Sequence, residues 1–299
     1  MGGAPHLFDR DLQRRRLARA LAGGEDAFFL VRRCAEDLSD RLAAVLRRFP
    51  TAADIATPTR DAVGVLSDSG KVDTILRVAP VIPRTDEAGM AAVADEERLP
   101  LAPASLDLAV SLLALQAVND LPGTLVQIRR ALRPDGLFVG CLLGGESLTE
   151  LRHCFARAES EVEGGASPRV APFADIRDMG GLLQRAGFAL PVTDADTMTV
   201  RYRDAFALFA DLRAMGATNA LVERRRTPLR RATLLRAAQL YGRDFADADG
   251  RVRATVEIIW LSGWAPHESQ QKPLRPGSAR MRLAEALGVP ERPAGETAG

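Results

Sequence analysis

The sequence predicts an α/β fold built on a doubly wound, mostly parallel sheet whose two faces are covered by helices. Two apolar runs support this prediction, because they are continuous rather than alternating, as in strands buried on both faces. These runs are Leu106–Leu113 and Leu137–Leu143. Between them, Val126–Leu132 has helical spacing and Arg133–Gly136 has the composition of a turn. Strand, crossover helix and strand follow one another, so a ligand is expected beyond the carboxyl ends of the strands.

The composition is that of a globular chain with a substantial core. Its 299 residues are 46% hydrophobic, enough for one large domain or two smaller ones. A net charge of +1 argues against nucleic acid as the principal partner. Three cysteines without CxxC spacing indicate neither a disulfide framework nor a structural zinc site. No run approaches the roughly 20 apolar residues that cross a bilayer, so we expect a cytoplasmic protein without a membrane span.

The N-terminal part is expected to be helical and to lead into the sheet. Residues 9–48 have the spacing of one or two amphipathic helices. The arginines at 14–16 have no aromatic neighbours that could stack bases, so we interpret them as a solvated helix face. Thr51–Ile55 is expected to be the first strand and Thr74–Val78 the second.

The second half of the chain is expected to complete the sheet around a helical insertion. Helices are predicted over 146–157 and 173–188, the latter closed by Gly187. Leu190–Tyr202 is predicted to be the sixth strand. Arg251–Gly263 alternates with a period of two and should pair with it as an antiparallel seventh strand. The insertion, Asp204–Phe245, is expected to cover the cleft.

These elements divide the chain into five predicted parts. They are an N-terminal helical cap (1–48), a Rossmann-like core (49–202), a helical substrate or partner insertion (203–249), the last strand with the end of the core (250–273), and a C-terminal helix with a flexible tail (274–299). The C-terminal helix is expected at Ser278–Leu287, before a segment rich in proline and glycine.

Several segments between Leu7 and Pro273 carry a resemblance to a known family. They include LFDRDLQRRR, LALQAVNDLP, LFVGCLLGGESLTELR, FADLRAMGATNA and WAPHESQQKP. Together they resemble the class I S-adenosylmethionine (SAM) methyltransferases, and among them the methyltransferase-like family that includes the complex I assembly factor 5 proteins. That family is similar to the biotin-synthesis malonyl-carrier-protein methyltransferases. The resemblance implies a Rossmann-like sheet of seven strands, SAM as cofactor, and a cleft covered by the N-terminal segment.

The resemblance also implies where SAM would bind. Asp95 closes the third strand and, with Glu96 beside it, matches the place that hydrogen-bonds the adenine amino group; an acid capping a loop is the alternative. The stretch after the fourth strand, from Ser111 through Leu115 to Gln116, would line the cleft. In the N-terminal segment, Phe8 and Arg10 would be lid contacts.

One corner of the implied site departs from the family pattern. After Asp54 and Ile55, where a glycine-rich turn is expected, the chain reads Ala56-Thr57-Pro58-Thr59-Arg60-Asp61-Ala62. The second strand carries Arg77 where an acid should pair with the ribose hydroxyls; Asp86 or Glu87 could replace that acid. Asp54, Ala56 and Arg77 should therefore border a weakened cofactor site. Lost hydrogen bonds and strained backbone predict a loss of SAM affinity of about a hundred- to ten-thousandfold.

Two functions follow from the resemblance and its departure. The first is SAM-dependent methyl transfer to a small-molecule or protein acceptor, which needs alignment rather than acid–base groups, so no catalytic residue is predicted. The alternative is a non-catalytic binding or assembly protein, of the respiratory complex I type, with weakened or lost SAM binding. The family also implies arginine hydroxylation as a third reading, which would need a metal or oxidant source that the sequence does not show.

Two further patterns of the sequence could bind ligands. Glu150 and His153 stand at helical i, i+3 spacing, but no third ligand is near, so no metal site is predicted. The basic run Glu223–Arg231 in the insertion could dock an acidic protein partner, or it could be a solvated loop and helix start.

Overall fold

The computed structural model describes residues 6–82 and 89–271. The expected C-terminal helix at Ser278–Leu287, the expected tail, and the candidate acids Asp86 and Glu87 lie outside the described residues. The described residues up to Pro266 form one compact unit, and those from His267 belong to a second. In the second unit, the backbone N–H of Gln270 donates to the carbonyl of His267.

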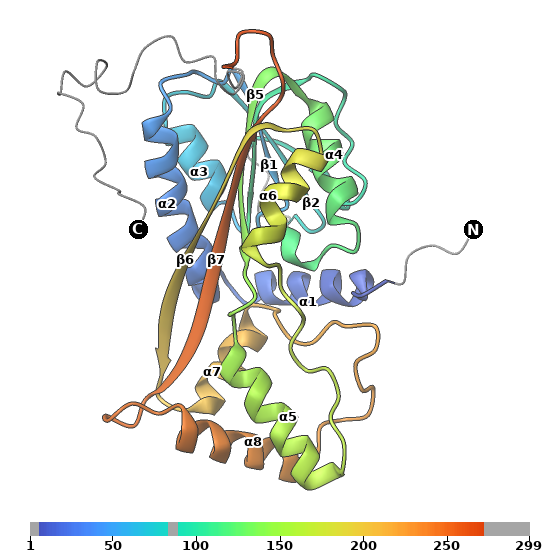
Figure 1. The fold of residues 1–299 in the computed structure, drawn as a ribbon, viewed down its shortest axis with the longest axis vertical. Helices are drawn as coiled ribbons and strands as arrows, with labels where there is room; N and C mark the ends of the chain where they lie inside the picture. Colours follow the sequence, from blue (N-terminus) through green and yellow to red (C-terminus); the bar gives the residue numbers. More distant parts are fainter. Residues whose placement is uncertain (1–5, 83–88, 272–299) are drawn as a thin grey trace, which may run out of the picture. The chain divides into compact units, whose positions relative to one another are not determined.

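The compact unit contains a sheet of seven strands in the order β3-β2-β1-β4-β5-β7-β6. Neighbouring strands from β3 to β5 run parallel, whereas β7 is antiparallel to both β5 and β6. The predicted doubly wound sheet with an antiparallel last strand is therefore confirmed (Figure 1). The strands are β1 (Thr51–Ile55), β2 (Thr74–Ala79), β3 (Met90–Val93), β4 (Leu106–Leu112), β5 (Leu132–Leu143), β6 (Ala189–Tyr202) and β7 (Val252–Trp264).

Several predicted boundaries differ from the structure. The helices predicted over 146–157 and 173–188 run over Thr149–Glu163 and Ile176–Arg185. The expected turn at Arg133–Gly136 belongs to β5, which begins at Leu132. The residues of this predicted turn make the strand irregular. Asp135 has a φ of 65°, and Leu106 and Leu108 of β4 pair with Leu132 and Leu137 of β5, a jump in the register. The backbone stays bonded across this jump, since the N–H of Asp135 donates to the carbonyl of Ala265 at 3.0 Å.

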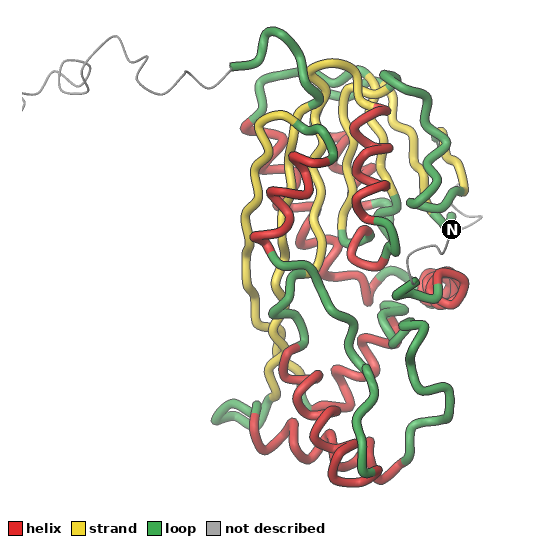
Figure 2. Tube along the Cα trace, turned by 45° about the vertical axis from the view of Figure 1, so that its right-hand side comes forward, coloured by secondary structure: helices red, strands yellow, loops and turns green. Residues whose placement is uncertain are grey.

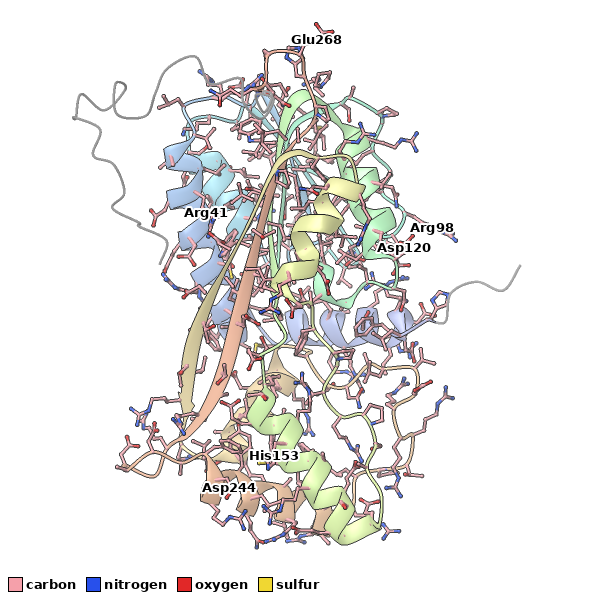
Figure 3. All side chains as sticks on the ribbon, in the orientation of Figure 1. Arg41, Arg98, Asp120, His153, Asp244 and Glu268 are labelled. Carbon is pink, nitrogen blue, oxygen red and sulfur yellow. The ribbon has the colours of Figure 1, made fainter. Side chains whose placement is uncertain are left out.

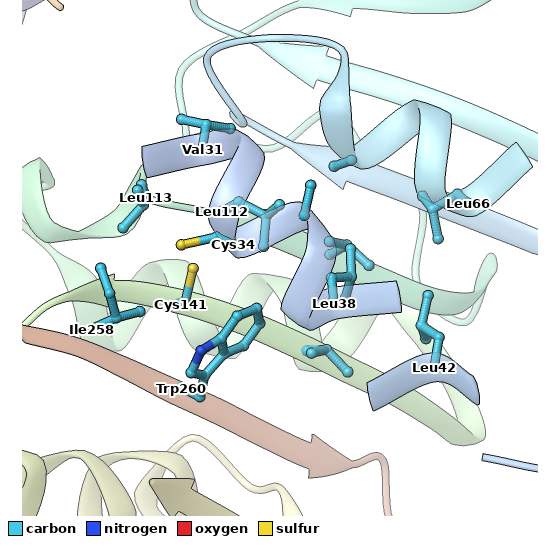
Figure 4. Close-up of a cluster of buried hydrophobic side chains, with 14 of the residues drawn as sticks. Val31, Cys34, Leu38, Leu42, Leu66, Leu112, Leu113, Cys141, Ile258 and Trp260 are labelled. Carbon is cyan, nitrogen blue, oxygen red and sulfur yellow. The ribbon is translucent and has the colours of Figure 1, made fainter. Parts of the chain in front are cut away.

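Helices cover both faces of the sheet, as predicted. α2 (Phe29–Ala44) and α3 (Asp61–Asp68) pack on one face, and α4 (Leu121–Ala131) and α6 (Ile176–Arg185) on the other (Figure 1). Figure 4 shows the first of these layers, in which Cys34 of α2 faces Cys141 of β5, and Leu42 of α2 lies on the side of Leu66 of α3. α4 begins after Asp120, whose carboxylate accepts the N–H of Gly123 (Figure 3).

A second, smaller cluster of helices packs where β6 and β7 extend beyond the rest of the sheet. It consists of α5 (Thr149–Glu163), α7 (Ala205–Ala214) and α8 (Arg231–Asp244), with Leu208, Leu240, Tyr241 and Val252 at its centre. α7 and α8 form the predicted insertion, and α5 joins them from the core sequence. α1 (Arg10–Ala22) lies between this cluster and the rest of the sheet (Figures 1 and 2). Among the described residues, no helix combines the length and apolarity needed to cross a membrane.

Candidate functional site

A cavity of about 300 Å³ lies beyond the carboxyl ends of the central strands, where the fold class places a ligand. The turn after β1 contributes Ala56 and Pro58 to its lining, and the segment after β4 contributes Leu113, Gln116 and Ala117. The remaining walls come from α1, the start of α2, the chain around Val170 and α7, and most of them are apolar. Residues of α7 and of the segment after it, within the predicted insertion, thus form part of the cavity wall. The covering role of Asp204–Phe245 stays a prediction.

The turn after β1 keeps a left-handed residue although it has no glycine. Ala56 has a φ of 62°, and its N–H donates to the carbonyl of Val78 at 2.6 Å. A left-handed conformation costs an alanine on the order of 1 kcal/mol. Deeper in the turn, the hydroxyl of Thr57 accepts the N–H of Leu112 at 3.1 Å and is fully buried. β1 is thus fastened to both of its neighbours at the rim of the cavity.

A buried ion pair occupies the corner between β1 and β2. Asp54 and Arg77 are opposite each other in the strand register, and Arg77 Nε lies 3.7 Å from Asp54 Oδ2. The Arg77 side chain is 5% exposed and the Asp54 side chain 0%. The same guanidinium donates to the carbonyls of Thr57 and Pro58, at 3.3 and 3.2 Å. Arg77 therefore fastens the turn from below, at the place where the family resemblance expects a ribose-binding acid.

The acids after β3 are held by α1. Arg10 makes ion pairs with both Asp95 and Glu96, and Arg14 lies 3.3 Å from the second oxygen of Asp95. Arg10 also donates to the carbonyl of Ala117 at 2.9 Å. It thus links α1 to the segments after β3 and β4. Phe8 stands just before the helix, and its N–H donates to Asn119 Oδ1 at 2.8 Å.

The pKa values of the neighbouring carboxyls Asp95 and Glu96 are shifted in opposite directions. Burial raises the pKa of Glu96 above its ordinary value, against the opposing effect of the Arg10 charge. Burial also raises the pKa of Asp95, but the N–H of Glu97 and the Arg10 guanidinium outweigh it, so this pKa lies below its ordinary value. Burial therefore works against the charge of Glu96 and the Arg10 guanidinium supports it, whereas the hydrogen bond and the cations around Asp95 favour its charged form.

The predicted cofactor residues divide into those that reach the cavity and those that lie behind it. Ala56 and Glu96 line the cavity, as do the predicted lid residues Phe8 and Arg10. Among the others, Asp54, Arg77, Ser111 and Leu115 are buried behind the lining, and Asp95 is partly exposed. Their role in cofactor binding stays a prediction.

Gln116 brings an unpaired polar atom to the cavity lining. Its Nε2 donates to the carbonyl of Leu113 at 2.7 Å, but its Oε1 is buried without a hydrogen-bond partner among the described residues. Ser111 Oγ is likewise buried without such a partner, although it lies in β4 behind the lining. Gln116 Oε1 is therefore an acceptor available to a ligand in the cavity.

Sequence reasoning missed the wall segment, residues 216–219, which lies between α7 and α8. Arg16 donates to the carbonyls of Thr218 and Asn219 at 2.7 and 2.6 Å. A side chain at Gly216, whose φ is 73°, would meet the carbonyl oxygen of Arg16 at 3.1 Å. Gly216, just before the segment ATNA, is a local signal that another part of the backbone approaches closely. Nothing in the sequence indicates that this other part is α1.

Glu150 and His153 do not share a ligand site in the structure. Glu150 accepts hydrogen bonds from the N–H and the hydroxyl of Thr255. The His153 ring packs edge-on against Phe245, with ring centroids 6.1 Å apart, on the outer cluster of helices (Figure 3). Within residues 6–82 and 89–271, no group of three or more His, Cys, Asp and Glu side chains is arranged to hold a metal ion.

The residues present fit one end of SAM and not the other. Glu96 and Gln116 offer acceptors to an adenine amino group. At the other end, ribose hydroxyls need an acceptor, and a guanidinium has none. Pro58 stands in the turn where the family resemblance places glycine, and it lines the cavity. The ribose corner therefore lacks the acceptor that the family resemblance places there, and SAM binding by this chain stays a prediction.

Comparisons with known proteins agree with the fold. A family model described as "Methyltransferase domain" matches residues 78–140. The human protein "Arginine-hydroxylase NDUFAF5, mitochondrial" is 37% identical over 290 residues, covering 94% of this chain and 83% of its own length. A "Malonyl-[acyl-carrier protein] O-methyltransferase" of Xylella fastidiosa is 41% identical over 172 residues, covering 58% of this chain and 56% of its own. The YcgJ protein of Bacillus subtilis shares the fold, with a TM-score of 0.53 at 12% identity, over 78% of this chain and 99% of that one.

Proposed function

We propose a function from the premise that this chain belongs to the class I SAM-dependent methyltransferase family, among the relatives of the NDUFAF5 arginine-hydroxylases. Within that family, we propose that it acts as a binding protein of the assembly-factor type. The methyltransferase fold would hold a partner or ligand, and the cofactor corner would have lost most of its affinity for SAM. A role of the respiratory complex I type is the form of this proposal that the family resemblance favours.

The observation that supports this proposal is the Asp54–Arg77 pair. Both side chains are buried, and the Arg77 guanidinium also donates to the carbonyls of Thr57 and Pro58. A cation held this way cannot turn aside for a ligand without leaving Asp54 and two carbonyls behind. One lost charge-assisted hydrogen bond costs about 1.5 to 3 kcal/mol, and repulsion of the SAM cation adds to it. SAM binding in the micromolar range would weaken to about the millimolar range.

Methyl transfer is a second candidate, and the turn at Ala56 favours it. The left-handed backbone there is the conformation that a glycine-rich cofactor turn uses, and the cavity opens directly beside it. SAM would supply an activated methyl group when bound. The chain's own contribution would be alignment and exclusion of water, with α1 and α7 enclosing the acceptor. No feature of the described residues adds support for arginine hydroxylation, which stays a prediction from the resemblance.

Calorimetric titration with SAM separates the two candidates. For the wild-type protein we expect a dissociation constant of about 1 mM or weaker. The comparison variant carries Ala56→Gly, Pro58→Gly, Arg60→Gly and Arg77→Glu, and we expect it to gain affinity. A control that carries the three glycines but keeps Arg77 tests whether the guanidinium, rather than the turn, is the obstacle. Micromolar binding by the wild-type protein would refute the binding-protein proposal and favour methyl transfer.

A further inference from the structure

A second concavity, which we call the arginine cleft, lies on the far side of the wall segment. Its volume is about 1050 Å³, and it is formed by α1, α7, the chain between α7 and α8, and the start of α8. Seven arginines line it, together with two aspartates, Asp9 and Asp26. The arginines are Arg16, Arg19, Arg169, Arg213, Arg224, Arg225 and Arg226. In a chain of net charge +1, this is a strong local concentration of positive charge.

Three of the arginines are neutralised within the protein. Arg169 donates to Glu159, Arg224 lies 2.9 Å from Asp9, and Arg225 donates to Glu163. The basic run that the sequence analysis singled out is therefore partly internal, because two of its arginines support the fold.

The remaining arginines are left without acids of their own. Among the described residues, no ion pair is formed by Arg16, Arg19, Arg213 or Arg226, and Asp26 is the one lining acid that stands outside these pairs. Arg19, Arg213 and Arg226 are exposed. They come from α1, from the end of α7 and from the chain before α8. Three separate parts of the chain thus direct unpaired cations into one cleft.

Arg16 sits deeper and is held in place. Its guanidinium donates to two carbonyls of the wall segment, and burial, followed by the nearby Arg224 cation, lowers its pKa from the ordinary arginine value. Arg224 itself is paired with Asp9, but Arg16 and Arg19 of α1, Arg213 of α7 and Arg226 remain cations without an ion pair among the described residues. Such an arrangement is relieved when an anion binds.

The floor of the cleft is apolar. It consists of partly buried side chains from four elements: Phe155, Phe209, Leu212, Leu229 and Leu234. Phe155 and Phe209 pack together, with ring centroids 5.6 Å apart. A small inorganic anion would satisfy the arginines and leave this floor uncovered. An acidic peptide that also carries apolar side chains would satisfy both.

We propose that the arginine cleft binds an acidic segment of a partner protein, with its carboxylates on Arg19, Arg213 and Arg226 and its apolar side chains on the floor. This inference rests on the proposed binding role of the chain, and it names the chemistry of the partner. The wall segment lines both the arginine cleft and the cavity, so the docked segment lies directly against the candidate site. Arg16 orients that wall.

The test is fluorescence anisotropy of the full chain with a labelled synthetic peptide in which glutamates alternate with leucines. The test variant combines Arg19→Glu, Arg213→Glu and Arg226→Glu. Its matched control makes the same charge change away from the cleft, at Arg98, Arg130 and Arg185, which are exposed. Figure 3 shows Arg98 on the loop that follows β3. We expect the test variant to bind the peptide about a hundredfold more weakly than the wild-type protein, and the control to lose no more than a fewfold.

Several outcomes would overturn the proposal. No binding by the wild-type protein at low salt would do so, as would equal losses in the test variant and the control. A peptide with serine in place of leucine should bind more weakly. Equal binding of the two peptides would contradict the proposed contact between the peptide's apolar side chains and the apolar floor of the cleft. Thermal unfolding of each variant verifies that the exposed substitutions leave the fold intact. The SAM titration tests the proposed function, and the peptide experiment tests the arginine cleft. Failure of one proposal can therefore be told apart from failure of the other.

Discussion

The two sides of the cavity rim are closed in different ways. On the β1–β2 side, Arg77 and Asp54 belong to adjacent strands, so the closure is built into the sheet. On the β3–β4 side, Asp95 and Glu96 are covered by Arg10 of a helix that comes from elsewhere in the chain. The first closure opens only if the buried Arg77 side chain leaves both Asp54 and two backbone carbonyls, whereas the second opens if α1 moves away. A ligand can therefore compete for the second side far more easily than for the first.

The largest expected effect breaks the closure within the sheet. Arg77→Met leaves the fully buried Asp54 without its guanidinium and releases the carbonyls of Thr57 and Pro58. We expect a loss of about 3 to 5 kcal/mol in the free energy of unfolding, measured by denaturant titration. Arg98→Met, at an exposed position, should change it by no more than about 0.5 kcal/mol.

A double variant sharpens the same point. If the loss arises from the uncompensated buried charge, Asp54→Leu added to Arg77→Met should recover much of it, because an apolar pair avoids the desolvation of both ions. A loss below about 1 kcal/mol for Arg77→Met alone would contradict the idea that this pair closes the corner.

The second effect opens the closure made by α1. Arg10→Ala removes the partner of Glu96, whose side chain is 6% exposed, and leaves Asp95 Oδ1 with the N–H of Glu97 as its remaining donor. We expect a loss of about 2 kcal/mol at neutral pH. Arg15→Ala, at an exposed position of the same helix, is the matched control and should be nearly neutral.

The pH dependence of that loss has a definite sign. Burial raises the pKa of Glu96 in the folded protein above its unfolded value, and removing Arg10 raises it further. A carboxyl whose pKa is higher in the folded protein than in the unfolded chain stabilises the folded state at pH values below the unfolded pKa. That stabilisation is lost as the pH rises through the folded pKa. The deficit of the Arg10→Ala variant should therefore grow as the pH rises over the range above the ordinary pKa of a glutamate. A deficit that shrinks over this range would show that Glu96 does not depend on Arg10.

The same contrast explains what the sequence could and could not predict. Strand positions follow from local apolar runs, so β1 was placed at its observed bounds and the antiparallel β7 was identified from its alternation. The turn at Arg133–Gly136 was misplaced, because β5 tolerates a left-handed Asp135 that local composition reads as a break. The loss of the ribose acid could be predicted from Arg77 itself. Its pairing with Asp54 required the register of two strands that lie twenty-odd residues apart, which no local pattern gives.

Contacts of α1 were still harder to predict, because they join segments remote in sequence. Phe8 and Arg10 were expected at a lid from the family resemblance, and they do line the cavity. Nothing in the sequence beyond the number of basic residues predicts that Arg16 donates hydrogen bonds to the wall segment. The same holds for the unpaired arginines that α1 and α7 bring to one cleft. Such surfaces form only when helices that are remote in sequence pack together in the folded chain.

The smallest expected effect concerns Ala56, where two terms oppose each other. Ala56→Gly removes the strain of a left-handed alanine, worth on the order of 1 kcal/mol, but it also removes a buried methyl group, worth about 0.8 kcal/mol. We expect the free energy of unfolding to change by less than about 0.5 kcal/mol. Ala53→Gly, in the regular part of β1 and equally buried, relieves no strain and should cost more than about 1 kcal/mol. Equal losses in the two variants would mean that the turn at Ala56 carries no strain, and the β1–β2 corner would then be closed by the Asp54–Arg77 pair alone.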